Sequence, residues 1–313
     1  MSVTMKAVRI HTYGGLEVLK YEDVPVPQPG TGELLVRIHA AGVNPVDWKV
    51  REGYMKDYVT HTLPLILGWD FSGVVEALGS GVTRTLKNDD VYGRPDLSRD
   101  GAYAEYIVVR ESEVARKPKS VDHLQAAAVP LAGLTAWQAL FDKAELKTGQ
   151  KILIHAAAGG VGSFAVQFAK WKGAHVIGTA SRKNQDLVRK LGAEEVVDYQ
   201  KTRFEEVVRD VDVVFDTIGG ETQRRSWKVL KKGGTLVSIV AVPSAQEAAA
   251  HDVRAVFFAC QPNGAQLTEI ARLIDAGKVR SVVDTIMPLA EARRAQELSQ
   301  GGHTRGKIVL RVI

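Results

Sequence analysis

The chain has 313 residues, 45% of them hydrophobic and 25% charged, which is the composition of an ordinary globular protein of about two domains. Its single cysteine, Cys260, excludes an intramolecular disulfide and any cysteine-rich zinc module, and no apolar run is long enough to span a membrane. The net charge of +5 is a mild excess scattered along the chain, so we expect neither a nucleic acid nor a membrane as partner.

The amino-terminal part of the sequence predicts β structure. Short segments rich in Val, Ile and Tyr are separated by turns that contain Pro and Gly, a pattern typical of a barrel or sandwich. Residues 57–66 are expected to form an irregular loop. The expected strands are Met5–Ile10, Glu17–Val24, Glu33–Ala41, Gly73–Leu78, Asp90–Gly93 and Ala102–Arg110.

From about Val121 onward, strands and helices alternate. Apolar strands that lie between helices indicate a parallel sheet covered on both faces, and therefore an α/β fold of the doubly wound, Rossmann type. The expected strands are Lys151–Ala156, Ala174–Thr179, Glu195–Asp198, Val211–Asp216 and Gly234–Val240, with Arg254–Cys260 at the edge of the sheet. The expected helices are Val161–Lys172, Asn184–Leu191, Phe204–Arg209 and Thr222–Leu230.

The carboxyl-terminal segment has no obvious place in that parallel sheet. It contains an expected helix, Ala265–Ala276, and expected strands near Val282–Met287 and Lys307–Val312. We therefore expect the end of the chain to return to the first domain.

A turn of small residues after the first parallel strand predicts a dinucleotide site. The pattern G-x-G-x-x-G fails because Ala157 occupies the first glycine position, but Gly159, Gly160, Val161 and Gly162 remain. Small residues let backbone N–H groups approach a pyrophosphate, and the dipole of the following helix favours its negative charge. A tight structural turn is the alternative, and the strand–helix units that follow favour the dinucleotide.

The end of the next strand indicates which dinucleotide binds. Enzymes that use NAD place a carboxylate there, whereas this chain has Ser181, Arg182 and Lys183 and no carboxylate before Asp186. An acidic residue would repel a 2′-phosphate, and these three residues suit it. Ser181 can also cap the next helix. The sequence favours NADPH over NADH.

A second glycine-rich segment resembles a phosphate-binding loop only in part. Gly301–Lys307 satisfies most of the pattern, but Ile308 replaces the required Ser or Thr and a strand follows where a helix is needed. We expect no nucleoside triphosphatase site there.

Taken together, these features resemble the medium-chain dehydrogenase/reductase superfamily, and more narrowly its zinc-independent quinone oxidoreductases, the zeta-crystallin-like group. Four passages carry the resemblance, namely Ala40–Lys49, Leu67–Val75, Ala157–Gly162 and Gly301–Leu310. The resemblance implies a β-rich GroES-like catalytic domain at residues 1–122 and 263–313. It also implies a Rossmann NADPH-binding domain at residues 123–262, and a homodimer joined at the sheet edges.

Zinc-dependent relatives hold a catalytic metal on a Cys, a His and a second Cys or Asp. By the resemblance, the corresponding positions are Asn44, Trp69 and Leu131. An indole and an isobutyl group cannot ligate Zn²⁺. We therefore expect no metal site.

The resemblance places the segment from Asn44 to Lys49 beside the nicotinamide. Lys49 is the leading catalytic candidate because its ammonium could polarise a carbonyl or hold a ribose hydroxyl, and Tyr54 is a weaker candidate for proton donor. Asn44 and Asp47 could act in the site or simply cap the helix that starts at Pro45. For Lys49 the alternative is a solvated surface lysine.

Further cofactor contacts come from the resemblance alone. It implies that Thr135 approaches the phosphate or ribose, that Tyr199 lies near the adenosine, and that Phe258 and Lys307 flank the nicotinamide end. Tyr199 and Phe258 could equally be core aromatics.

The leading hypothesis is an NADPH-dependent reductase that transfers hydride to a small-molecule quinone or α,β-unsaturated carbonyl without zinc. One alternative is an alkenal or enone double-bond reductase with little quinone activity. Another is a non-catalytic NADPH-binding protein, crystallin-like or RNA-binding. The single cysteine and an amino terminus without a signal-peptide pattern predict a cytoplasmic location.

Overall fold

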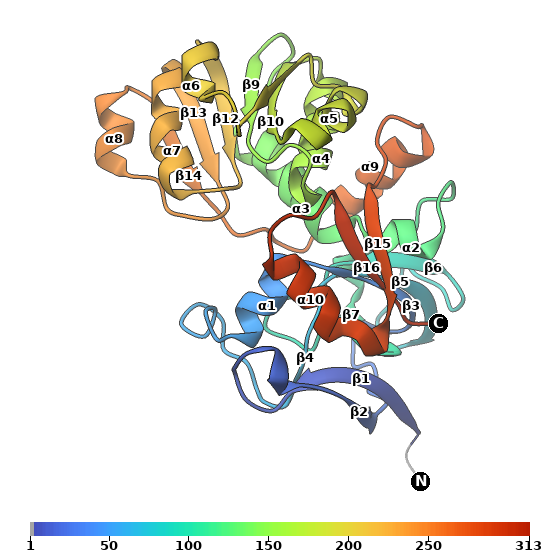
Figure 1. Ribbon diagram of the computed structural model, residues 1–313. Coiled ribbons are helices and arrows are strands. Elements are labelled where there is room, and N and C mark those ends of the chain that lie inside the picture. The colour runs from blue at the N-terminus through green and yellow to red at the C-terminus, as the bar shows by residue number, and fades with distance from the viewer. Residues whose placement is uncertain (1–2) are drawn as a thin grey trace. The chain divides into compact units, whose positions relative to one another are not determined.

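A computed structural model describes residues 3–313, and the chain divides into two compact units (Figure 1). The first unit holds the chain up to Leu134 together with Gln261–Gly277 and Ser281–Ile313. The second unit holds Thr135–Cys260 and Lys278–Arg280. Among the helices of the described residues, none combines the length and the apolar sequence that a membrane span requires.

The first unit is β-rich and is built on a seven-stranded sheet. Its strands run in the order β15-β16-β3-β5-β6-β8, and β7 pairs with β3. A smaller sheet has the order β2-β1-β4. The bounds of the strands are β1 Thr4–Ile10, β2 Leu19–Pro25, β3 Glu33–Val43, β4 Leu65–Ile66, β5 Phe71–Leu78, β6 Asp90–Gly93, β7 Tyr106–Arg110, β8 Val114–Arg116, β15 Val283–Pro288 and β16 Lys307–Arg311.

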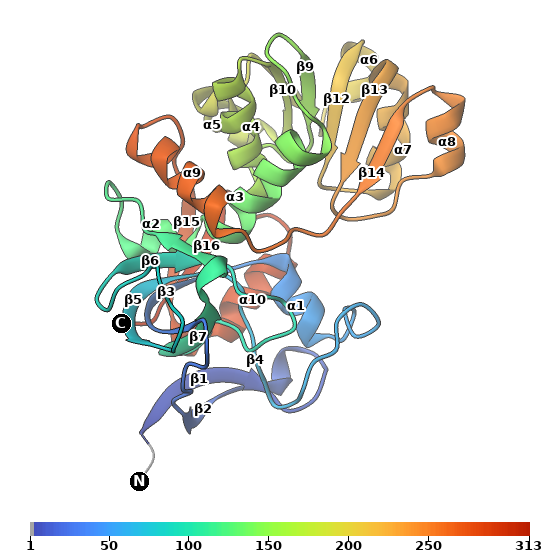
Figure 2. The same ribbon diagram turned by 180° about the vertical axis from the view of Figure 1, so that it is seen from behind.

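The end of the chain returns to the first unit, as the sequence predicts. Strand β16 pairs antiparallel with β3, with Ile308 opposite Val43 and Leu310 opposite Ala41. This pairing puts Lys307 beside the residue that follows β3, which is Asn44. The helices of this unit are α1 Pro45–Arg51, α2 His123–Ala127, α9 Gly264–Asp275 and α10 Ala292–Gln300, and α3 Pro130–Trp137 crosses into the second unit (Figure 2).

The second unit has a six-stranded parallel sheet in the order β11-β10-β9-β12-β13-β14. Ile152, Leu153 and Ile154 follow one another in β9 and are all fully buried, so both faces of the sheet are covered. The strands are β9 Lys151–Ile154, β10 His175–Ala180, β11 Glu195–Asp198, β12 Val211–Asp216, β13 Leu230–Ser238 and β14 Arg254–Phe257. The helices are α4 Gly160–Lys172, α5 Gln185–Leu191, α6 Phe204–Val207, α7 Gly220–Ser226 and α8 Ala245–Ala250.

The strand order of the second unit confirms the predicted Rossmann-type fold. Successive strands spread in one direction from β9 to β11 and in the other from β12 to β14, so the direction of the winding reverses between β9 and β12. In such sheets, ligands bind outside the carboxyl ends of the strands at this reversal. The turn that follows β9 is therefore in the expected place for a dinucleotide.

Several short elements differ from the sequence-based expectation. A 3-10 turn, Leu16–Val18, precedes β2 where one continuous strand was predicted, and β4 lies within the segment predicted as an irregular loop. Helices α2, α3, α8 and α10 were not predicted. Three of these are under nine residues long, too short for a clear helical repeat of apolar positions, and depend on the packing around them.

Candidate active site

A buried polar network in the first unit joins three distant parts of the chain. The Lys307 ammonium donates to the Asp70 carboxylate, with Nζ 3.0 Å from Oδ2, and also to the Asn44 carboxamide oxygen. The Asn44 amide nitrogen donates to the same Asp70 oxygen at 2.8 Å. The other oxygen of Asp70 accepts from the Leu131 backbone N–H at 2.5 Å. All the polar side chains in this network are buried, so water does not solvate the Lys307 ammonium or the Asp70 carboxylate. The two opposite charges stabilise each other instead.

Asp47 is a second buried carboxyl group next to this network. One of its oxygens accepts from the Asn44 backbone N–H and from the Tyr103 hydroxyl, each at 2.7 Å. Its other oxygen has no hydrogen-bond partner among residues 3–313. Complete burial raises the pKa of Asp47 to about 7, against the lowering effect of the two hydrogen bonds. A protonated, neutral Asp47 carboxyl is consistent with the one oxygen that has no hydrogen-bond partner, because an ionised oxygen there would be buried without compensation.

The raised pKa of Asp47 predicts a change in how stability depends on pH. Between about pH 4 and pH 7 this carboxyl is protonated in the folded state and ionised in the unfolded state. The stability that it contributes is therefore present below its unfolded pKa and is lost as the pH rises through 7. We expect Asp47→Asn, which cannot titrate, to make the slope of unfolding free energy against pH more positive in this range, by up to about 1.4 kcal/mol per pH unit.

Urea unfolding at pH 5, 6 and 7 for both proteins measures the two slopes. Asp57→Asn, which replaces an exposed carboxylate on the loop after α1, is the control. Parallel pH profiles for the wild type and Asp47→Asn would contradict the proposed protonation of Asp47.

Lys49 lies on the same short helix, α1, but two residues beyond Asp47 and so on another face of the helix. Its side chain is half-buried, burial lowers the pKa of its ammonium, and no carboxylate of residues 3–313 pairs with it. The ammonium lies 5.7 Å from the ring centre of Trp48. The N–H donors of the Lys49 ammonium are therefore available to a ligand, whereas the Lys307 ammonium donates to Asp70 and Asn44.

Tyr54 lies on the loop after α1. Its backbone N–H donates to the Lys49 carbonyl at 2.9 Å, and its ring meets the Trp48 ring edge-on with centroids 6.3 Å apart. Its side chain is 63% exposed. The structure thus brings Lys49 and Tyr54 together around Trp48, and brings Asn44, Asp47 and Lys307 together in the buried network.

Some members of this site carry no sequence signal of their own. Asp70 and Tyr103 hold the predicted residues in place, yet neither was predicted to do so. Asp70 follows Trp69 in one of the passages that carry the family resemblance, so its position, next to an expected metal-ligand position, was the available signal. Tyr103 lies far from Asp47 in the sequence, and no local pattern links them.

The turn after β9 in the second unit can accept a dinucleotide. Gly159 caps helix α4, which has 13 residues and begins at Gly160, so the N–H groups of Gly160 and Val161 lie at its amino end. A Cβ on Gly162 would lie 2.2 Å from the carbonyl oxygen of Ala156, so only glycine lets the helix pack against the turn this closely. These residues fit the pyrophosphate of a dinucleotide.

The residues predicted to select NADPH lie at the same edge of the sheet. Strand β10 ends at Ala180, Ser181 is buried immediately after it, and Arg182 and Lys183 are exposed. Within the described part of the chain neither cation pairs with a carboxylate. Tyr199 follows the neighbouring parallel strand β11 and is 56% exposed. Two free cations and a serine hydroxyl are therefore clustered where a 2′-phosphate is expected.

The remaining predicted cofactor residues of the second unit are buried. Thr135 lies in α3 and is 4% exposed. Phe258 follows β14 and is 8% exposed, and the Lys143 ammonium lies 5.9 Å from its ring centre. Lys307 belongs to the first unit, with its ammonium bound to Asp70 and Asn44.

Comparison with known proteins identifies both parts of the sequence. Residues 30–119 match the alcohol dehydrogenase GroES-like domain, and residues 191–310 match the zinc-binding dehydrogenase family. The mitochondrial NAD(P)H oxidoreductase RTN4IP1 of Mus musculus is 36% identical over all of this chain and 90% of its own length. The chloroplastic NADPH-dependent alkenal/one oxidoreductase of Arabidopsis thaliana is also 36% identical, over 98% of this chain and 79% of its own length.

Solved structures agree with these sequence matches. The quinone oxidoreductase from Coxiella burnetii superposes with a TM-score of 0.91 and 37% sequence identity, covering 99% of this chain and 100% of its own. The quinone oxidoreductase from Pseudomonas syringae pv. Tomato DC3000 superposes with a TM-score of 0.90 and 32% identity, covering 98% of this chain and 100% of its own.

Proposed function

The chain belongs to the medium-chain dehydrogenase/reductase superfamily and is an NAD(P)H oxidoreductase of the quinone oxidoreductase and alkenal/one reductase type. From this premise we propose that it uses NADPH to reduce a quinone or an α,β-unsaturated carbonyl, and that it does so without zinc. The observation that carries the zinc-independent part of the proposal is the buried Lys307 ammonium bound to Asp70 and Asn44.

The residues present do not fit a catalytic zinc ion. Of the three expected ligand positions, Trp69 is fully buried and donates its indole N–H to the Arg99 carbonyl, and Leu131 has no donor atom in its side chain. Asn44 offers an amide oxygen, which already accepts from Lys307. Zinc requires thiolate, imidazole or carboxylate ligands, and a dication beside a buried ammonium would be repelled.

Reduction of a conjugated carbonyl suits this set of side chains. Bound NADPH supplies the hydride. Conjugation spreads the negative charge that hydride addition creates, so a hydrogen-bond donor at the acceptor oxygen can replace the Lewis acid that alcohol oxidation needs. The half-buried Lys49 ammonium is the proposed donor, Tyr54 or water the proposed proton source, and Asn44 and Asp47 hold the start of α1.

We propose that Ser181, Arg182 and Lys183 bind the 2′-phosphate of NADPH, with Thr135, Tyr199 and Phe258 along the rest of the cofactor and Lys307 near its nicotinamide end. NADPH is expected to bind at least about tenfold more tightly than NADH, a difference of about 1.4 kcal/mol that one charge-assisted contact supplies. Replacing Arg182 and Lys183 by Ala should weaken NADPH binding and leave NADH binding nearly unchanged. Calorimetric titration with both cofactors measures this, and equal affinities in the wild type would contradict the assignment.

The second candidate function is reduction of alkenals or enones at the double bond with little activity on quinones. The relative named as an alkenal/one oxidoreductase favours it. Steady-state NADPH oxidation with matched panels of quinones and enones tests both candidates. NADPH binding without turnover of any acceptor would instead support a non-catalytic, crystallin-like or RNA-binding role.

We propose that the protein is a homodimer in which two copies of β14 join the parallel sheets. Strand β14 is at the edge of the sheet, carries the apolar sequence Ala255-Val256-Phe257, and Phe257 is 44% exposed. Such an edge pairs with another strand unless charge protects it. Light scattering should give twice the chain mass of 34.1 kDa, and Val256→Lys should give a monomer. Arg254→Lys, which keeps the charge on the same strand, is the control, and a wild-type monomer at micromolar concentration would refute the dimer.

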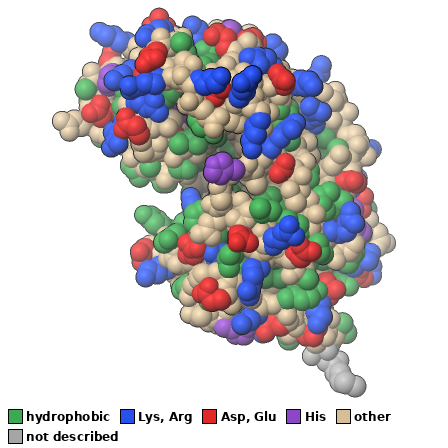
Figure 3. All heavy atoms as spheres, in the orientation of Figure 1, with side chains coloured by type: hydrophobic (Ala, Val, Ile, Leu, Met, Phe, Trp, Pro, Cys, Tyr) green, Lys and Arg blue, Asp and Glu red, His purple; other side chains and the backbone are tan. Residues whose placement is uncertain are grey.

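Nucleic acid and membrane partners are not part of this proposal. On the face drawn in Figure 3, basic and acidic side chains are interspersed.

We propose a cytoplasmic location, although the relatives are named mitochondrial or chloroplastic. Cell fractionation tests the location.

A further inference from the structure

A pocket in the second unit combines aromatic rings, of which Trp171 is exposed, with basic side chains. It is an open hollow of about 400 Å³, within the range of small-molecule sites. It lies between the segment after α3, the loop before β9 and the end of α4. The side chains that line it and carry the argument are Trp137, Phe141, Leu146, Lys147, Trp171 and Lys172.

The aromatic rings of the pocket pack against one another. The indoles of Trp137 and Trp171 are nearly parallel, 27° apart with centroids at 6.2 Å, and Phe141 meets the Trp137 ring edge-on at 4.7 Å. Phe168 also meets the Trp137 ring edge-on, with centroids 5.4 Å apart. Trp171 remains 45% exposed although its neighbours hold it in place. A planar ring can therefore stack on it without rearrangement of the pocket.

The backbone that carries Phe141 has an uncommon shape. Residues Gln138–Lys143 form a π-helix, in which the Ala144 N–H donates to the Ala139 carbonyl five residues earlier, at 2.9 Å. Such wide turns are rare and are found frequently at functional sites. This is an observation independent of the exposed rings.

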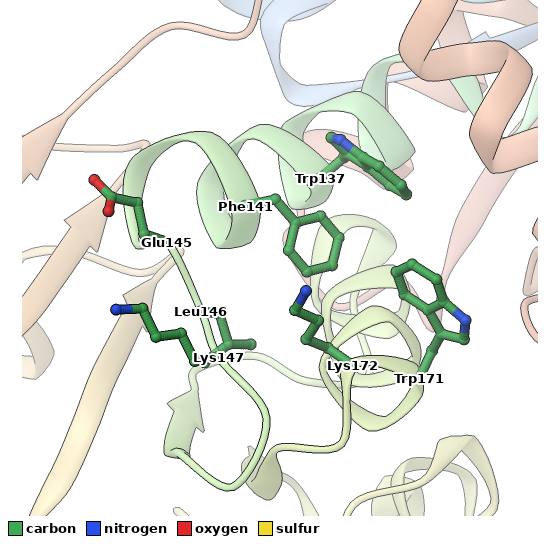
Figure 4. Close-up of a pocket in the computed structure, with 7 residues that line it drawn as sticks. All are labelled: Trp137, Phe141, Glu145, Leu146, Lys147, Trp171 and Lys172. Atoms are coloured by element: carbon green, nitrogen blue, oxygen red, sulfur yellow. The ribbon is translucent and has the colours of Figure 1, made fainter.

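The charge of the pocket is positive. Figure 4 shows the Lys172 ammonium pointing in between Phe141 and Leu146, while Lys147 and Glu145 extend to the other side. In residues 3–313 neither lysine is paired with a carboxylate. Lys172 is at the carboxyl end of α4, where a positive charge also stabilises the helix dipole. Its charge therefore indicates a ligand site only together with the aromatic side chains that line the pocket.

The pocket is separate from the dinucleotide turn of the same unit. Helix α4 begins in that turn at Gly160 and ends at Lys172, and a rise of 1.5 Å per residue puts the two ends about 18 Å apart. The pocket lies next to the start of β9, whereas dinucleotides bind at the carboxyl ends of the strands.

We propose that this pocket binds a small, flat aromatic anion, an arene carboxylate or sulfonate, with its ring on Trp171 and its acid group at Lys172. The exposed indole of Trp171 selects a planar ring, and the unpaired ammonium selects a negative charge.

Titration of 2-naphthoate into protein saturated with NADPH, followed by ligand-observed NMR, tests the proposal. Excess NADPH blocks the dinucleotide turn. We expect a Kd on the order of 1 mM, weakened about tenfold or more by Trp171→Ala and by Lys172→Met. The uncharged 2-naphthamide should bind about tenfold more weakly than 2-naphthoate. Lys20→Met, which removes an exposed lysine from the first unit, is the control and should not change the affinity.

Three results would overturn the proposal. Unchanged affinity in Lys172→Met would show that the ammonium does not select the anion. Loss of 2-naphthoate binding when NADPH is added would place the probe in the dinucleotide site. A smaller assembly of Trp171→Ala in light scattering would show that a second copy of the chain covers the pocket. The melting temperature of Lys172→Met should match the wild type because that side chain is exposed. Trp171→Ala loses ring contacts and should melt at a lower temperature, so retained NADPH binding distinguishes a lost site from a lost fold in this variant.

Discussion

Replacing Lys307 by methionine is expected to lower the free energy of unfolding by about 3–5 kcal/mol. The methionine side chain nearly fills the same space but leaves the fully buried Asp70 carboxylate without its cation. Breaking a buried pair costs this much because the remaining charge is neither solvated nor compensated. Equilibrium unfolding in urea measures the loss.

Lys6→Met is the matched control for this experiment. The Lys6 ammonium is 2.8 Å from the Asp23 carboxylate, similar to the 3.0 Å of the buried pair, but the two side chains are 42% and 60% exposed. An exposed pair contributes about 0–1 kcal/mol, so Lys6→Met should have little effect. The double variant Lys307→Met, Asp70→Asn removes both charges and should recover part of the loss. Equal stability of Lys307→Met and Lys6→Met would contradict the assignment of Lys307 and Asp70 as a buried ion pair.

Replacing Lys49 by alanine is expected to lower turnover about a hundredfold, which corresponds to about 2.7 kcal/mol of transition-state stabilisation. The ammonium is half-buried without a carboxylate partner among the described residues, so its donors are available to the acceptor oxygen. Steady-state kinetics with NADPH and a quinone or enone measures the effect. If Lys49 holds only the cofactor ribose, the apparent NADPH constant should rise with little change in turnover.

Two further variants make the Lys49 result specific. Lys56→Ala removes an exposed lysine from the loop that follows α1, and its turnover should remain that of the wild type. Asn44→Ala removes bonds to Asp70 and Lys307, so it should lower the melting temperature more than Lys49→Ala does. Wild-type turnover and wild-type NADPH affinity in Lys49→Ala would mean that its ammonium is merely solvated.

The function of Asn44 shows what a local pattern can and cannot tell. The sequence Asn44-Pro45-Val46-Asp47 predicts a helix start, and α1 begins at Pro45 as expected. Asp47 does accept the Asn44 backbone N–H, as a capping residue would. The carboxamide of Asn44, however, bonds with Asp70 and Lys307, two residues that no spacing rule connects to it.

The sequence by itself determined the fold class and the family, and it predicts the place of the dinucleotide turn. Runs of apolar residues such as Ile152–Ile154 indicate a sheet that is covered on both faces. The glycines at 159, 160 and 162 indicate a close turn between that strand and the next helix. These are properties of neighbouring residues, so they can be recognised without knowing what lies elsewhere in the chain.

Only the tertiary structure decided the chemistry of the buried network. Lys307 is 263 residues from Asn44 and 237 from Asp70, and it reaches them because β16 pairs with β3 in one particular register. The raised pKa of Asp47 likewise depends on complete burial, which outweighs the lowering effect of the hydrogen bond from Tyr103, 56 residues away. Long-range strand pairing decides which charged groups are buried and which partners they contact. The pKa values and the stability contributions of those groups depend on this environment and not on their neighbours in the sequence.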